Sequence, residues 1–195
     1  MRFARLHSEL KLRAALLAHF RRDRRGVSAI EFAFIAPILI LLYVGVAEIG
    51  NALTIFRRTS TVAMTASDLT AQVKKVSAAD LKDIVAASSS ILAPYASTSP
   101  TPLKIVISSV VADKDNKTTV AWSYASSGAS AHGDKSDYPV PAGLTEPNSS
   151  VIVAEITYAF TPLLGLTEIF SPEPFEIKRT FYTRPRRSLT VAKTN

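Results

Sequence analysis

The hydrophobic pattern is dominated by a long apolar run near the start of the chain. Residues 32–47 are uncharged, and between residues 27 and 56 the only charged or amide side chains are Glu31, Glu48 and Asn51. About 20 apolar residues are enough for a helix to cross a bilayer. The pattern therefore predicts a transmembrane helix over residues 27–56, with a buried core helix as the alternative explanation of the same run.

The apolar pattern becomes one-sided after this run. Apolar residues recur at spacings of three, four and seven, which is the period of one helix face. They are Ile55, Val62, Ala66, Leu69, Val73 and Val76. No glycine or proline interrupts residues 51–76. The helix is therefore expected to continue as an amphipathic stalk over residues 57–76 and to pack on a globular head.

A second helix is predicted to begin at Ser77. Ser77 and Asp80 have the spacing of a capping box, and Val76 and Leu81 have the spacing of a hydrophobic staple. The apolar face of this helix consists of Leu81, Ile84, Val85, Ile91 and Leu92. The proline-containing segment that starts at Pro94 is expected to end it.

The second half of the chain has the pattern of strands. Segments rich in β-branched and aromatic residues predict strands at residues 103–112, 118–125, 150–160 and 174–185. Residues 128–148 are rich in Gly, Ser, Pro and Asp and are expected to form a long surface loop. The predicted fold class is therefore α+β, with the two helices followed by an antiparallel sheet of about three to five strands. The head is assigned to residues 77–195.

The positive charge of the chain is concentrated before the apolar run. The formal net charge is +7, and residues 1–26 hold eight basic and two acidic side chains, which leaves +1 for the remaining residues. Basic residues beside a hydrophobic helix mark its cytoplasmic side. Residues 1–26 are therefore expected to be a cytoplasmic leader, and the chain beyond residue 56 to lie outside the cytoplasm. Because the basicity belongs to this flank, nucleic-acid binding is not expected despite a pI of 9.8.

Few side chains are suited to a catalytic or metal site. The chain contains no cysteine and three histidines, of which only His132 follows the apolar run. No nucleophile-elbow, phosphate-loop or zinc-protease motif occurs. His132 and the loop carboxylates are expected to be solvated. These carboxylates are Asp113, Asp115, Asp134 and Asp137. We therefore predict no catalytic, cofactor-binding or metal-binding residue, and a protein that is not an enzyme.

Three interpretations of the N-terminal region are open. A secretory signal peptide ending at Ala47 would release a secreted enzyme, although Glu31 inside the apolar core argues against it. An arginine-rich mitochondrial presequence is disfavoured by Glu9, by Asp23 and by the membrane span. The third interpretation is cleavage before the apolar segment.

The residues around Gly26 favour the third interpretation. The segment RRGVSAIEF resembles the processing site of type IV prepilins, in which a prepilin peptidase cuts after the glycine of a basic leader. The resemblance implies that Val27 is the first mature residue, Glu31 the fifth and Phe32 the sixth. Glycine lets the backbone enter a tight protease site, and the new ammonium of Val27 can pair with a carboxylate of a neighbouring subunit. Gly26, Val27, Glu31 and Phe32 are therefore the candidate processing and assembly residues.

Segments from both halves of the chain resemble one family. The later half contains a strand that ends in an aromatic residue and Pro-Leu, and a last strand that closes with Arg-Pro-Arg. The matching residues are Tyr158, Phe160, Pro162, Leu163, Arg184, Pro185 and Arg186. Together with GVSAIEFAFIAPIL and ASDLTAQ nearer the start, this pattern is similar to that of the TadE/TadG-like proteins of tight-adherence, Flp-type pili.

The resemblance to the short, TadE-like members implies a minor pilin or pseudopilin. It implies a single-pass protein of the bacterial inner membrane, with its N terminus in the cytoplasm and its head periplasmic or extracellular. The implied partners are other pilin-like subunits, the pilus assembly machinery, the prepilin peptidase and membrane lipid. The alternative is a single-pass membrane protein with an uncleaved leader and an extracytoplasmic binding head. The mature N terminus separates the hypotheses: Val27 for the pilin, Met1 for the uncleaved protein and Glu48 for the secreted enzyme.

Overall fold

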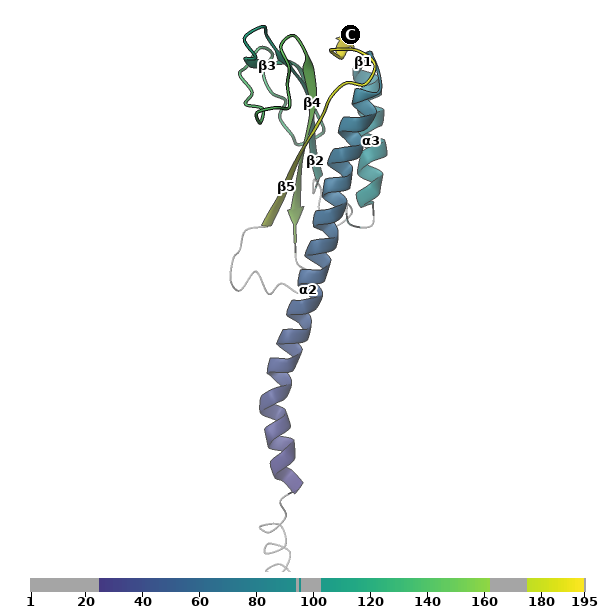
Figure 1. The fold of residues 1–195 in the computed structure, drawn as a ribbon. Helices are drawn as coiled ribbons and strands as arrows, with labels where there is room; N and C mark the ends of the chain where they lie inside the picture. The colour runs from purple at the N-terminus through teal and green to yellow at the C-terminus, as the bar shows by residue number, and fades with distance from the viewer. Residues whose placement is uncertain (1–24, 94, 96–102, 162–174, 195) are drawn as a thin grey trace, which may run out of the picture. The chain divides into compact units, whose positions relative to one another are not determined.

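The computed structural model describes residues 25–93, 95, 103–161 and 175–194. Its helices are α2 (Arg25–Ala71), α3 (Ala78–Ser89) and the short 3-10 helix η1 (Ser90–Leu92). Its strands are β1 (Lys75–Ser77), β2 (Leu103–Ala112), β3 (Thr118–Ala125), β4 (Ser150–Phe160), β5 (Phe175–Thr183) and β6 (Ala192–Thr194). This arrangement confirms the predicted α+β class (Figure 1). Leader residues 1–24, the predicted helix end at Pro94, and the motif residues Pro162 and Leu163 lie outside the described residues.

Helix α2 runs from the apolar segment into the predicted stalk, but it ends earlier than expected. It stops at Ala71, and Val76 lies in the short strand β1 instead. The chain divides into two compact units between Ala47 and Glu48. Residues 48–56 therefore group with the head, because Ile55 is already buried in its core.

The main sheet has four antiparallel strands in the order β3-β2-β4-β5. Strands β2, β3 and β4 have the predicted bounds, and β5 lies within the predicted fourth strand. The central strand β4 aligns Ile156 with Ile105 of β2, and Tyr158 with Ile177 of β5. Because side chains alternate along a strand, every second residue of β4 faces the helices.

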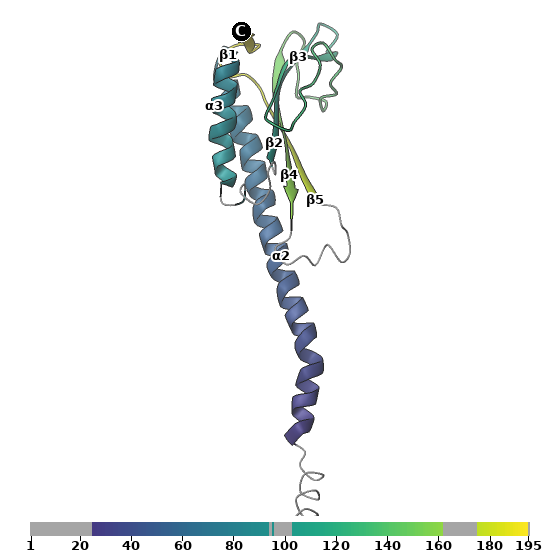
Figure 2. The same cartoon turned by 180° about the vertical axis from the view of Figure 1, so that it is seen from behind.

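The main hydrophobic core lies on the sheet face covered by the helices (Figures 1 and 2). Strand β4 contributes Ile152, Ala154, Ile156, Tyr158 and Phe160 to it. Helix α2 contributes Ile55, Val62 and Ala66 from the predicted stripe, and the chain after it contributes Val76, Leu81 and Leu92. Burying one large aliphatic side chain is worth about 1.5–3 kcal/mol. This apolar contact is therefore the main force that holds the described head together.

Several hydroxyl-bearing residues of α2 are buried without breaking the helix. Thr59 and Thr70 donate their hydroxyl hydrogen bonds to the carbonyl groups one turn earlier, at Ile55 and Ala66, over 2.8 Å. A threonine that bonds to its own helix in this way leaves no unpaired buried hydroxyl. Ser67 is also buried, and its hydroxyl lies 2.9 Å from the hydroxyl of Thr183 in β5.

The C-terminal segment returns from β5 to the end of α2, a connection that the sequence pattern did not predict. Strands β1 and β6 form a parallel pair in which Val76 aligns with Lys193. The backbone N–H of Arg186 donates to the carbonyl of Ala71 over 2.9 Å. The indole N–H of Trp122 donates to the carbonyl of the buried Val191 over 2.7 Å. Helix α2, strand β3 and the C-terminal segment are thereby joined.

A smaller core lies on the opposite face of the sheet. It contains Val110, Val120, Val151 and Val153, with Tyr138, Val140 and Tyr182 packed against them. Residues 128–148 thus form a loop, as predicted, but one that packs on the sheet. The expectation that His132 is simply solvated is wrong, because its ring contacts Tyr138 and its Nε2 atom lies 2.5 Å from an oxygen of Glu155.

The predicted capping box at the start of α3 is present. The N–H and hydroxyl of Ser77 donate to the carboxylate of Asp80 over 2.9 and 2.7 Å, and the N–H of Asp80 donates to the hydroxyl of Ser77 over 3.1 Å. The backbone hydrogen bond from Ser77, followed by the hydroxyl bond, holds the pKa of Asp80 below its ordinary value. The box therefore prefers the ionised carboxylate.

This preference makes the start of α3 sensitive to acid. Because the pKa is lower in the folded state, the box stabilises α3 fully above the ordinary aspartate pKa of about 3.9, and this stabilisation is lost as the pH falls through the lowered value. We expect Asp80→Ala to weaken hydrogen-exchange protection of α3 at neutral pH and to remove its decline in acid. Asp83→Ala, at an exposed aspartate of the same helix, should behave as the unmodified protein does.

Candidate membrane and assembly segment

The first half of α2 presents apolar side chains in every direction. All residues from Gly26 to Ala47 are described, and none is buried. The exposed large apolar side chains include Val27, Ile30, Phe32, Phe34, Ile35, Ile38, Leu39, Ile40, Leu41, Leu42, Tyr43 and Val46. The 21 residues from Val27 to Ala47 span about 31 Å as a helix, which matches a hydrocarbon core of about 30 Å. Among the described residues, α2 is the one helix long and apolar enough to cross a membrane.

All four predicted site residues lie in the first turns of α2. Val27 is 50% exposed and Phe32 is 67% exposed. Val27 and Glu31 are four residues apart, which places them one above the other on the same helix face. Glu31 is exposed as well, so no side chain among the described residues covers this face.

The surroundings of Gly26 give it no structural reason to be glycine. A Cβ atom built at Gly26 meets no heavy atom within 4 Å. Glycine in a helix is about 1 kcal/mol less favourable than alanine. The helix therefore tolerates a side chain at this position, and any requirement for glycine must come from something outside the described chain.

Two arginine side chains connect α2 to other parts of the head, and the sequence did not predict these contacts. The Arg179 guanidinium of β5 lies over the ring of Phe56, 3.5 Å from its centroid. Arg58 donates to the carbonyl of Ile91 over 3.1 Å and lies 5.3 Å from the ring centroid of Tyr95. Cation–π contacts of this kind contribute about 0.5–2 kcal/mol each. Nothing in the local pattern pairs these residues, since their partners are distant along the chain.

The Arg-Pro-Arg segment has a structural role in the head. The side chain of Arg184 donates to Glu146 over 2.8 Å and to the carbonyl of Leu144 over 3.1 Å. The guanidinium of Arg186 forms an ion pair with Asp68 of α2. The two arginines therefore fasten the end of β5 to the 128–148 loop and to the helix.

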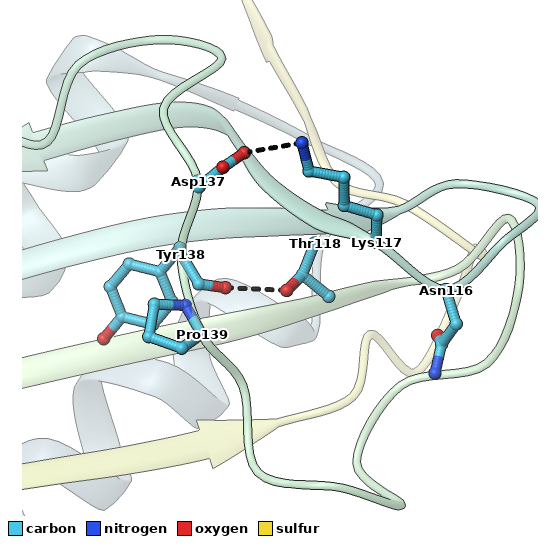
Figure 3. Close-up of a pocket in the computed structure, with 6 residues that line it drawn as sticks. All are labelled: Asn116, Lys117, Thr118, Asp137, Tyr138 and Pro139. Atoms are coloured by element: carbon cyan, nitrogen blue, oxygen red, sulfur yellow. Dashed lines mark hydrogen bonds and ion pairs between the residues drawn. The ribbon is translucent and has the colours of Figure 1, made fainter.

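Two open hollows occur on the described part of the head. One, of about 490 Å³, lies between α2 and β5 and is lined by residues that include Met64, Leu69 and Phe181. The other, of about 290 Å³, lies between the β2–β3 turn and the 128–148 loop (Figure 3). There the hydroxyl of Thr118 donates to the carbonyl of Tyr138 over 2.7 Å. No group of three or more His, Cys, Asp or Glu side chains suited to a metal ion occurs within the described ranges.

The fold of the head and the exposed first part of α2 together define the class of protein: an α+β head with an apolar anchor helix. Comparison with protein families identifies the helix further, because residues 26–68 match the family model described as TadE-like protein. The predicted resemblance to TadE-like proteins is thereby confirmed over this segment, which begins at Gly26 and ends three residues before α2 does. No curated protein and no solved structure matches the chain significantly. The TadE-like match and the apolar helix together support a membrane protein related to the Tad pilus system.

The exposed apolar surface generates a test of membrane insertion. Leu39 lies near the middle of the run and is 54% exposed. Leu39→Arg should cost about 3 kcal/mol of insertion free energy, because arginine at the centre of a span is strongly disfavoured. We expect a large fraction of the variant to be extracted from membranes by alkaline carbonate.

Met64→Arg is the matched control, because Met64 lies on the same helix and is 55% exposed but belongs to the head unit. It should remain in the membrane pellet. Equal extraction of the two variants would contradict the assignment of the anchor to residues 27–47.

Proposed function

We propose that this protein is a minor pilin or pseudopilin that takes part in assembly of a Flp-type, tight-adherence pilus. In this proposal a prepilin peptidase removes the leader after Gly26, and α2 then anchors the mature protein in the inner membrane with its head outside the cytoplasm. The role is structural and not enzymatic. The observation that carries it is the apolar first part of α2, in which no residue from Gly26 to Ala47 is buried and at whose start the TadE-like match begins.

The chemistry of the helix start supports processing at this position. Gly26 has open space around its Cα atom, so the fold does not require the glycine, whereas a protease that grips the backbone closely does. The cluster of arginines before Gly26 supports retention of the leader in the cytoplasm. Cleavage at this peptide bond leaves the apolar helix with a free ammonium group at Val27.

The proposed assembly contact uses this ammonium and the carboxylate of Glu31. A charge within the bilayer is costly unless it is paired. Within one chain the two groups lie on successive turns of the same helix, and the carboxylate is exposed. We propose that in a bundle of pilin-like subunits Glu31 of one chain pairs with Val27 of the next, while Phe32 adds apolar contact. The partners are other pilin-like subunits and the assembly machinery.

The deciding experiment is to sequence the mature N terminus after expression with the cognate peptidase. The proposal expects Val27, with a loss of about 3 kDa from the 21.1 kDa chain. Gly26→Leu should abolish this loss while leaving the protein in the membrane, because leucine suits the helix but not a site that accepts only glycine. Ser28→Leu, on the other side of the cut, is the matched control and should still be processed.

Other termini would contradict the proposal. Met1 in the presence of active peptidase supports a single-pass protein with an uncleaved leader. Glu48 supports a secreted protein released by signal peptidase. Normal processing of Gly26→Leu would show that the glycine is not what the peptidase recognises.

The role proposed for Glu31 predicts a specific loss of assembly. If its carboxylate pairs with a neighbouring ammonium in a dry helix bundle, Glu31→Gln leaves that charge unpaired at a cost of roughly 3–5 kcal/mol. We expect membrane insertion and head folding to be retained, and capture of pilin-like partners to fall by at least about a hundredfold. Crosslinking in membranes measures the capture, and surface pili should also decrease.

Glu176→Gln provides the control, because it removes the same charge from an exposed site on β5. It should capture partners as the unmodified protein does. Undiminished capture of partners by Glu31→Gln would mean that the carboxylate only extends to the membrane–water interface and has no role in assembly.

A further inference from the structure

A compact polar cluster lies on the sheet face opposite the helices. Nε2 of His132, in the 128–148 loop, is 2.5 Å from Oε2 of Glu155 on β4. Their side chains are only 36% and 30% exposed. The ring of Tyr138 meets the imidazole edge-on, with 5.2 Å between centroids. Burial, followed by the nearby charge of Glu155, raises the pKa of Tyr138, whose hydroxyl is hydrogen-bonded to Glu155 and Tyr182. Tyr138 therefore stays a neutral phenol.

The cluster is the central attachment of the 128–148 loop to the sheet face. Beneath the loop lie the four valines of the smaller core, Val110, Val120, Val151 and Val153. The loop also pairs with the edge of β3, where the N–H of Lys135 donates to the carbonyl of Val120 over 2.7 Å and the N–H of Tyr138 donates to the carbonyl of Thr118 over 3.2 Å. Figure 3 shows the ring of Tyr138 on the side away from Thr118. The loop thus covers both an apolar strip and a sheet edge.

We propose that the His132–Glu155 pair is a pH-sensitive latch that holds the 128–148 loop against this sheet face most tightly when the imidazole is protonated. An imidazolium and a carboxylate attract each other as ions and share a hydrogen bond, whereas a neutral imidazole retains only the hydrogen bond. Histidine is the side chain whose charge ordinarily changes between about pH 5 and 8. Raising the pH through this range therefore loosens the loop.

Other polar and charged groups lie around the latch on the neighbouring elements. Glu155 of β4 and Tyr138 of the loop contact the imidazole, and Tyr182 of β5 is hydrogen-bonded to Tyr138. On the β3 side, the hydroxyl of Ser123 accepts the N–H of His132 over 3.1 Å, and Lys193 of β6 lies 3.4 Å from the Ser123 carbonyl.

Charges further along the loop are paired or exposed. Lys117 and Asp137 form an exposed ion pair at 3.3 Å, and Glu146 pairs with Arg184 at 2.8 Å. Asp134 and Lys135 are exposed. His132 is the one histidine among the described residues of the loop.

Hydrogen exchange of the full-length protein in detergent micelles tests the proposal. The amides of Lys135 and Tyr138 report loop opening, because both donate to β3. After correction for intrinsic exchange rates, their protection should fall about two- to fivefold between about pH 5.5 and pH 8, the range expected for a partly exposed ion pair. Amides of the β2–β4 ladder should keep their protection and so verify that the head stays folded.

Variants separate the latch from general loop stability. His132→Gln keeps a hydrogen-bond donor but carries no charge, so its loop protection should not vary with pH, and Glu155→Gln should give the same result. Lys117→Gln removes the exposed pair with Asp137 and should keep the pH dependence of the unmodified protein. Equal protection of the unmodified protein at both pH values, or a persisting dependence in His132→Gln, would overturn the proposal.

Discussion

The structure depends on one helix that must satisfy two different solvents. Between Gly26 and Ala47 no side chain of α2 is buried by the chain itself, although nearly all are apolar. From Ile55 to Ala71 the same helix is one-sided, and its apolar stripe forms part of the head core. A helix that is apolar all round is stable only in lipid or among other apolar helices. The first half of α2 is therefore suited to a membrane, and the second half is part of the head core.

The head is attached to α2 by polar as well as apolar contacts. Ser67 bonds to Thr183, Asp68 pairs with Arg186, and the carbonyl of Ala71 accepts the N–H of Arg186. These contacts all join the last turns of α2 to the chain that leaves β5. These contacts make the last turns of α2 part of the head fold.

The elements that local pattern determines were predictable, and those that distant contacts determine were not. Strands β2, β3 and β4 follow from alternation and turn chemistry, and α3 follows from its capping box, because each signal lies within a few residues. The parallel pairing of β1 with β6 joins segments more than a hundred residues apart, and three residues have no periodicity to detect. The same holds for His132 and Glu155, which meet only because a loop folds back over the sheet. Of the candidate site, the apolar helix was predictable from composition, whereas the arginine contacts of Arg58 and Arg179 were not.

The motif residues that have a structural role in the fold can be separated from those that have none, and the second group is where a functional role is sought. Four described residues of the C-terminal motif are accounted for by the head. Tyr158 and Phe160 lie in its core, Arg184 pairs with Glu146 of the 128–148 loop, and Arg186 pairs with Asp68 of α2. At the start of α2 the residues have no such explanation, since a glycine lies in a helix with open space around it and an acid lies beside an apolar run. Residues that go against the local preferences of their helix or strand, without a compensating contact in the fold, occur most often at functional sites. This contrast is why we propose processing and assembly for the helix start and a structural role for the motif residues of the sheet, even though both regions carry recognisable motifs.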